Sequence, residues 1–117
     1  MSENQQIGID IVKIERFRKK KIFENQSFYE KIFTKSEISY CKRFIDPYPH
    51  FAGKFALKEA VQKSINENLV FNKIETFHSN SRPKIKLENS KEKYEFTASI
   101  SHENEYAIAI ALSKKEN

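Results

Sequence analysis

The most informative stretch of this sequence is residues 51–64, which read Phe-Ala-Gly-Lys-Phe-Ala-Leu-Lys-Glu-Ala-Val-Gln-Lys-Ser. At about 100° per residue, its apolar side chains spread nearly all the way around a helix. A helix that is apolar on most sides is buried by neighbours on several sides. We therefore expect a helix from His50 to about residue 64 or 65 in the middle of the core.

The segment that best predicts a strand lies near the N-terminus, at residues 7–12. Isoleucines alternate there with other residues, so Gly8, Asp10 and Val12 share the opposite face. A carboxylate within an apolar strand is costly to bury unless it is paired or bound to a metal. Gly8 leaves space beside Asp10, which suits close approach of a ligand. The alternative is an edge strand on which Asp10 faces water.

The remaining segments predict one α+β domain. Short helices are expected before the long helix and strands after it, because the apolar spacing changes to a period of two. A capping box at Thr34–Glu37 opens one of these helices, and Asp46–Pro49 ends it. The expected helices cover 14–22, 27–33 and 34–44, and the expected strands 70–77, 84–87, 94–101 and 106–112. We expect a single compact domain over residues 1–117, with a core at about 7–112 and an antiparallel meander packed on the long buried helix.

Composition excludes several classes of protein. The 117 residues include 21 Lys and Arg against 16 Asp and Glu, a formal charge of +5. With Cys41 as the only cysteine, there is no intrachain disulfide framework or cysteine zinc site, and a reducing compartment is the simplest setting. Two glycines are too few for a P-loop or a dinucleotide fingerprint. The basic excess suits nucleic acid, an anionic membrane, or an acidic or phosphorylated ligand.

Three further groups of residues could carry chemistry, and each has a simpler reading. Glu59 and Lys63 lie one turn apart on the long helix. They form either an ion pair on an exposed surface or a carboxylate and an ammonium group that bind a ligand. Ser99–His102 ends a strand and could hold a phosphate or simply face solvent. The basic run Arg16–Lys21 is either a solvated face or a docking patch.

Three separated segments together resemble one family. They are residues 8–17, residues 51–64, and residues 99–102 followed by Tyr106 and Ala107. In this order and spacing they resemble holo-[acyl-carrier-protein] synthase, a 4′-phosphopantetheinyl transferase. The resemblance runs from about Ile7 to Leu112, and it departs from the family pattern at Lys54, where an arginine is usual.

The resemblance implies a magnesium-dependent transferase. Such an enzyme moves the 4′-phosphopantetheine group of coenzyme A to a serine of apo acyl carrier protein and releases 3′,5′-ADP. Asp10 and Glu59 match the magnesium-binding carboxylates, and Lys63 matches a lysine beside the pyrophosphate. The proton of the serine would pass to Glu59 or to a metal-bound water. The coenzyme A-binding residues implied by the resemblance are Lys54, Lys58, Lys63, Ser101 and His102.

The resemblance also implies partners and a setting. Arg16 matches a position that contacts the acidic carrier protein, and the neighbouring Lys19, Lys20 and Lys21 would extend that patch. Family members of this length are homotrimers with active sites between subunits. We therefore expect a cytoplasmic enzyme of fatty acid biosynthesis and lipid metabolism, without nucleic acid binding or membrane insertion. The alternative is a non-catalytic basic module of the same fold that binds acyl carrier protein or nucleic acid.

Overall fold

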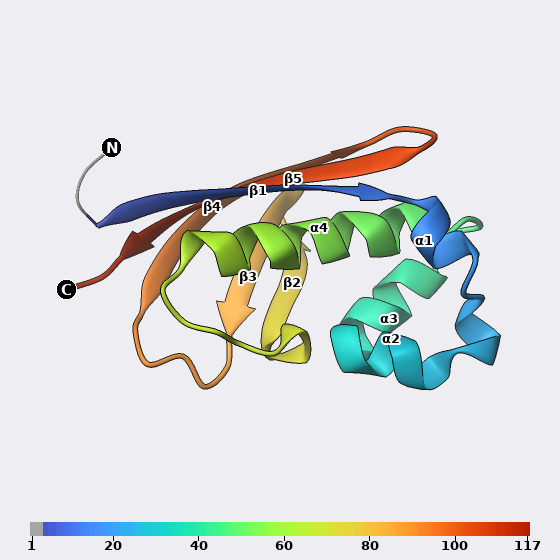
Figure 1. Ribbon diagram of the computed structural model, residues 1–117, viewed down its shortest axis with the longest axis horizontal. Helices are drawn as coiled ribbons and strands as arrows, with labels where there is room; N and C mark the ends of the chain where they lie inside the picture. The colour runs from blue at the N-terminus through green and yellow to red at the C-terminus, as the bar shows by residue number, and fades with distance from the viewer. Residues whose placement is uncertain (1–3) are drawn as a thin grey trace.

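Helix α4 (Tyr48–Ser64) lies along one face of a three-stranded antiparallel sheet (Figure 1). The sheet has the order β1–β5–β4, from β1 (Gln5–Lys13), β5 (Tyr106–Lys115) and β4 (Tyr94–His102). The computed structural model describes residues 4–117. The predicted α+β fold, with an antiparallel sheet packed on a long buried helix, is confirmed.

The other elements surround the rest of α4. A hairpin forms a separate two-stranded sheet, and short helices gather beside the N-terminal half of α4 (Figure 1). These elements are β2 (Ile74–Ser79), β3 (Arg82–Leu87), α1 (Glu15–Arg18), α2 (Gln26–Ile32), α3 (Lys35–Lys42) and the 3-10 helices η1 (Ile22–Glu24) and η2 (Phe71–Lys73). Because they enclose α4 on its remaining sides, nine of its first eleven residues are buried.

The structure corrects several expected boundaries. Helix α4 begins at Tyr48 and includes Pro49 in its first turn, where a missing backbone N–H costs nothing. Helix α1 ends at Arg18 and not at residue 22, and the Tyr29 hydroxyl donates to the carbonyl of Lys20 just beyond that end, at 2.7 Å. Residues 71–73 form a 3-10 turn before β2. The expected meander is instead two hairpins, with the N-terminal strand paired to β5.

Small residues allow β1 and β5 to approach α4 closely. The buried face of β5 presents three alanines, and the facing position of β1 is Gly8. A Cβ atom on Gly8 would lie 1.9 Å from the carbonyl oxygen of Ala60. The space beside Asp10 that the sequence assigned to a ligand is therefore filled by the backbone of α4. Gly8 instead sets the separation of β1 from α4, on which the position of Asp10 depends.

Replacing Gly8 by alanine should destabilise the protein strongly. The new methyl group meets backbone that cannot move aside without shifting α4, so we expect a loss of roughly 3 kcal/mol or more in the free energy of unfolding. The matched control is Gly53→Ala, where the nearest contact is the Cγ2 of Ile100 at 3.1 Å and a helical alanine is favourable. Urea unfolding of both variants measures the difference, and equal small losses would contradict this close packing.

The sheet face that points away from α4 carries an apolar surface. Ile9 and Ile11 of β1 are 55% and 61% exposed, and they pair across the sheet with Ile110 and Ile108 of β5. Ile7 continues the row along β1. The predicted strand is confirmed, but its isoleucine face lies outside the core of the single chain. A contiguous apolar surface of this kind marks an interaction site.

Candidate active site

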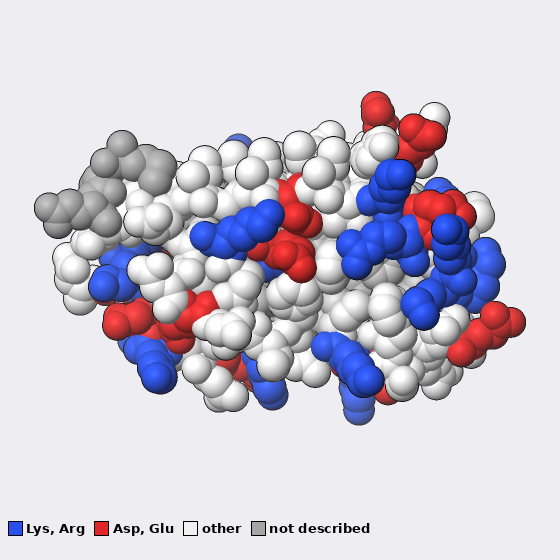
Figure 2. All heavy atoms as spheres, in the orientation of Figure 1, with Lys and Arg blue, Asp and Glu red and all other residues white. Residues whose placement is uncertain are grey.

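Asp10, Glu59 and Lys63 meet where β1 crosses α4. The Nζ atom of Lys63 lies 3.3 Å from Oδ1 of Asp10 and donates to the carbonyl of Ile9 at 3.0 Å. The Asp10 side chain is 17% exposed, whereas that of Lys63 is 53% exposed. Figure 2 shows acidic and basic side chains adjoining over α4 and β1 on an open face. The β1–β5 register and the Gly8 contact hold the strand carboxylate against the helix.

The electrostatics of this cluster suit a divalent cation. Partial burial and the nearby Asp10 carboxylate raise the pKa of Glu59, which Lys63 and Arg16 only partly oppose. Mg²⁺ takes one or two carboxylates and completes its shell with water and substrate phosphate. Within residues 4–117, no group of three or more His, Cys, Asp or Glu could hold a metal ion. Two carboxylates match the number of protein ligands that Mg²⁺ commonly takes beside a phosphate substrate.

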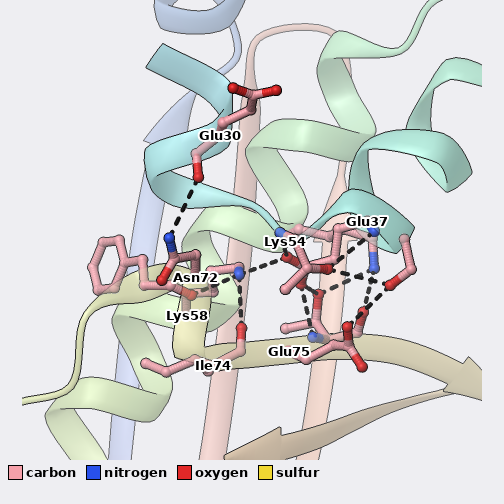
Figure 3. A network of polar contacts seen from close by, with 11 residues as sticks. Glu30, Glu37, Lys54, Lys58, Asn72, Ile74 and Glu75 are labelled. Carbon is pink, nitrogen blue, oxygen red and sulfur yellow. Dashed lines mark hydrogen bonds and ion pairs between the residues drawn. The ribbon is translucent and has the colours of Figure 1, made fainter. Parts of the chain in front are cut away.

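Lys58, one residue before Glu59, points into the interior of the protein toward Glu37 and Ile74 (Figure 3). Its ammonium group is fully buried and lies 2.6 Å from Oε1 of Glu37. It also donates to the carbonyls of Phe71 and Ile74, at 2.8 and 2.6 Å. All three ammonium hydrogens are thus used. The prediction that Lys58 binds a phosphate of coenzyme A is not supported, because this side chain holds α3, α4 and β2 together.

Glu37 is the acceptor at the centre of this buried network. Its Oε1 also accepts from the backbone N–H of Thr34, which completes the predicted capping box of α3. Its Oε2 accepts from the backbone N–H and the hydroxyl of Thr76, at 2.7 and 2.5 Å. The carboxylate is therefore saturated with donors, as a buried charge requires.

Lys54 extends the network toward a small pocket. It is only 3% exposed, and its Nζ donates to the carbonyl and the hydroxyl of Thr76 at 2.9 and 3.1 Å. Burial lowers the pKa of Lys54, an effect that Glu37 opposes. The pocket, of about 180 Å³, is lined by Lys54 together with Tyr40, Pro49, His50, Gly53, His78, Ile100 and His102. Two predicted residues, Lys54 and His102, are brought together here.

Ser101 does not join His102 in this pocket. Adjacent residues of a strand point to opposite faces, and Ser101 pairs with Ile108 on the outer, apolar face of the sheet. Lys54 and Lys63 are also apart, because nine helical residues place them about 180° apart around α4. Within one chain, the carboxylate cluster and the Lys54–His102 pocket therefore open on opposite sides of α4.

The basic run divides around α1. Arg16 and Lys19 line a cavity of about 390 Å³ together with Lys13. Arg18 also lines it and pairs with Asp46 at 2.7 Å. Lys20 and Lys21 do not line it, and they lie instead over aromatic rings of Phe28 and Tyr48. The predicted patch is therefore centred on Arg16 and Lys19, with Lys13 as a member that the sequence pattern did not indicate.

Comparison with known proteins identifies the family. Residues 6–111 match the family described as ACPS, the 4′-phosphopantetheinyl transferase superfamily. The chain belongs to this superfamily. Holo-[acyl-carrier-protein] synthases of Chlamydia felis and Thermodesulfovibrio yellowstonii are 42% and 40% identical to it. These alignments cover 92% and 91% of this chain and 94% and 95% of those proteins.

Solved structures of the same superfamily share the fold. The Helicobacter pylori holo-[acyl-carrier-protein] synthase in complex with coenzyme A superposes with a TM-score of 0.77 at 38% identity, covering 92% of this chain and 99% of that one. The Bacillus anthracis enzyme, in complex with coenzyme A (3′,5′-ADP), gives 0.80 at 27% identity, covering 95% and 96%. The predicted family, fold and enzyme class, holo-[acyl-carrier-protein] synthase, are thereby confirmed.

Two residues of the Lys54–His102 pocket could not be found from the sequence. His50 and His78 are separated from His102 by 52 and 24 residues, and neither belongs to a segment quoted for the phosphopantetheinyl transferase resemblance. They reach the pocket through the first turn of α4 and the end of β2. The sequence shows that the chain has three histidines, but it does not show that they are close in space. The packing of β2 and β4 on α4 brings them together.

Proposed function

We propose that this chain transfers 4′-phosphopantetheine from coenzyme A to apo acyl carrier protein at the cluster of Asp10, Glu59 and Lys63. The reaction is that of its family, and the supporting observation is the convergence of two carboxylates and an ammonium group at the crossing of β1 and α4. The H. pylori and B. anthracis relatives, described as complexes with coenzyme A, support this substrate.

Each side chain of the cluster has a distinct task in this proposal. Asp10 and Glu59 would hold Mg²⁺, which would neutralise the pyrophosphate and stabilise the charge that develops at the reacting phosphorus. Lys63, more than half exposed, binds a pyrophosphate oxygen and stabilises the departing 3′,5′-ADP. Glu59, with its raised pKa, is placed to accept the proton of the attacking serine. The serine oxygen then bonds to the phosphorus as the phosphoanhydride bond breaks.

We propose that the phosphates of coenzyme A span two subunits. The Lys54–His102 pocket and the carboxylate cluster open on opposite sides of α4, so one chain does not present both to one ligand. The exposed isoleucines of β1 and β5 offer a surface for a second copy, and Ser101 lies on that same face. A homotrimer with active sites at its interfaces, as the resemblance implies, would bring the two halves together.

Introducing a charge into the isoleucine face should separate the subunits. We expect wild-type protein to run as a trimer in native mass spectrometry and Ile9→Lys to run as a monomer that has lost most transfer activity. The expected loss follows from burying an unpaired ammonium group in an apolar interface. Phe77→Lys, at another exposed apolar position, is the control and should stay trimeric. A fully active wild-type monomer would contradict the shared site.

We propose that the cavity beside α1 docks the acidic carrier protein. Lys19→Glu should raise the KM for apo acyl carrier protein about tenfold and leave the KM for coenzyme A unchanged, because exposed charges act on protein encounter. Lys31→Glu on α2 is the charge-matched control. The effect should shrink as salt is added. If the two variants had the same KM for apo acyl carrier protein, the carrier protein would not dock at the cavity beside α1.

The decisive experiment is intact mass spectrometry of an apo carrier protein. Incubated with this chain, coenzyme A and Mg²⁺, the carrier should gain the mass of one phosphopantetheine group at its acceptor serine. The mass should not change when coenzyme A is omitted. No mass gain with any carrier protein would reject the proposed transfer. Among residues 4–117, no helix is long and apolar enough to cross a membrane, and the expected cytoplasmic location stays a prediction.

A further inference from the structure

All three histidines of the chain line the same pocket. His50 comes from the first turn of α4, His78 from the end of β2 and His102 from the end of β4. The rings of His50 and His102 lie 5.4 Å apart, centre to centre. Tyr40 stacks on His78 at 5.4 Å and so forms one wall. Three separate elements thus direct titratable rings at one volume of about 180 Å³.

The floor of this three-histidine pocket is a buried cation. The Nζ atom of Lys54 uses two hydrogens on Thr76, which leaves its third for a ligand. Glu37, the nearest buried carboxylate, is already engaged by Lys58 and Thr76 (Figure 3). A buried ammonium group under a pocket rimmed by imidazoles makes a site that favours an anion.

Burial and neighbouring positive charge disfavour the protonated forms of His50 and His78. Burial lowers the pKa of His50, and repulsion from His102, His78 and Lys54 adds to this effect. Partial desolvation lowers the pKa of His78, although its side chain still reaches solvent, and Lys54 adds to this effect. Asp46 opposes the shift at His50, but that carboxylate is shared with Arg18 at 2.7 Å.

Two acidic groups near the pocket are bonded to other residues. Asp46 pairs with Arg18, and Glu75, which acts on Lys54, accepts from Ser36 at 3.0 Å. Cys41 is buried with its pKa raised to about 12, so it stays a neutral thiol. The elements around the pocket carry these titratable and charged groups: Glu37, Tyr40 and Cys41 of α3, Asp46 before α4, His50 and Lys54 of α4, Glu75 and His78 of β2, His102 of β4, and Glu103 just after β4.

The Lys54–His102 pocket already has a coenzyme A phosphate assigned to it; we infer that binding of this phosphate is coupled to uptake of protons, and that His50 and His78 are further substrate-binding residues. This inference rests on the proposed function, because it takes coenzyme A as the ligand. The protonated imidazoles and Lys54 repel one another, whereas a phosphate dianion among them attracts each of these charges. The bound phosphate therefore raises the pKa values of the histidines around it. Protonated rings then donate hydrogen bonds to the phosphate. Affinity should therefore fall as the pH rises and the rings lose their protons.

Isothermal titration calorimetry of the wild-type chain tests this coupling. Titrating 3′,5′-ADP at pH 7 in buffers of different ionisation enthalpy should show net proton uptake of roughly half a proton or more per site. Between pH 6.5 and 8.5, where the second ionisation of the phosphate is largely complete, the Kd should rise about tenfold. Dephospho-coenzyme A is the second ligand: uptake with 3′,5′-ADP alone assigns the 3′-phosphate to the pocket, and uptake with both assigns the phosphate on the 5′ side.

Glutamine variants show which residues take up the protons. His78→Gln and the double variant His50→Gln/His78→Gln should reduce the uptake stepwise and flatten the pH dependence of the Kd to less than about threefold. Lys31→Gln, on α2, is the control with unchanged uptake. His78 is exposed, so its single variant stays informative if the double variant folds poorly. Histidine Cε1–H resonances should titrate at higher pH in the presence of 3′,5′-ADP.

The inference and the proposed function can fail separately. Binding of 3′,5′-ADP without proton uptake, or with equal uptake in the double variant, would overturn the role of His50 and His78 whatever the transfer activity. Proton-coupled binding in a chain that never modifies a carrier protein would overturn the proposed transfer and leave the phosphate pocket in place.

Discussion

Asp10→Asn and Glu59→Gln should each reduce phosphopantetheine transfer at least about 100-fold while leaving the protein folded. Each change removes one of the two carboxylates to which we assign the magnesium ion but keeps the size of the side chain. Asp10 is held by the contact of β1 with α4 and by Lys63 at 3.3 Å, so the amide keeps the local packing. The loss should appear in kcat/KM measured by intact mass spectrometry of the carrier protein.

The stability of the Glu59→Gln variant has a predictable pH dependence. The folded state raises the pKa of Glu59 through burial and the Asp10 charge, so the folded state disfavours the ionised form. The unfolded chain therefore releases this proton at a lower pH than the folded chain does. Wild-type stability falls as the pH rises from the unfolded pKa, about 4.3, to the raised folded one. The glutamine variant lacks this fall and should be at least as stable at pH 7.

A control outside the carboxylate cluster, just after β3, tests whether the effect is specific to the metal site. Glu88→Gln, in an exposed pair with Lys73, also removes one carboxylate and should retain activity within about threefold. Titration with Mg²⁺ gives a second readout, because the Asp10 and Glu59 variants should need higher concentrations for any residual activity. Full activity of both variants at ordinary Mg²⁺ concentrations would refute the assignment of the site.

The sequence predicted the central helix well because burial on several sides is a local property. The spread of apolar residues around α4 is visible without knowing what covers it. The alternation of β1 and β5 was equally visible, but not which face would be buried. Gly8 and the alanines of β5 decide that question, since their small side chains let α4 approach while the isoleucines stay outside.

The role of a charged residue was harder to predict than its place on the helix. Lys58 and Lys63 look alike in the sequence, yet one is fully buried and the other more than half exposed. The difference depends on Glu37, which lies 21 residues before Lys58 and meets it only when α3 packs on α4. Long-range partners of this kind leave no periodic signal in one sequence. The meeting of His50, His78 and His102 has the same origin.

Removing one partner of the buried Glu37–Lys58 pair should destabilise the protein more than any surface change. In Lys58→Met the methylene stem is replaced at similar volume, but the Glu37 carboxylate loses its 2.6 Å counter-charge while fully buried. We expect a loss of about 3–5 kcal/mol in the free energy of unfolding, the range for a buried pair broken on one side. Urea unfolding followed by circular dichroism measures it.

The double variant Glu37→Gln/Lys58→Met measures the interaction energy between these two side chains apart from their contacts with other residues. Glutamine keeps an acceptor for Thr76 without the charge, so the double variant should recover part of the loss, with a coupling energy of roughly 2 kcal/mol or more. Lys63→Met, five residues later on the same helix, is the matched control, and it should cost less than about 1 kcal/mol while removing transfer activity. If Lys58→Met were stable but inactive, Lys58 would act on substrate after all, and the buried pair would not describe its role.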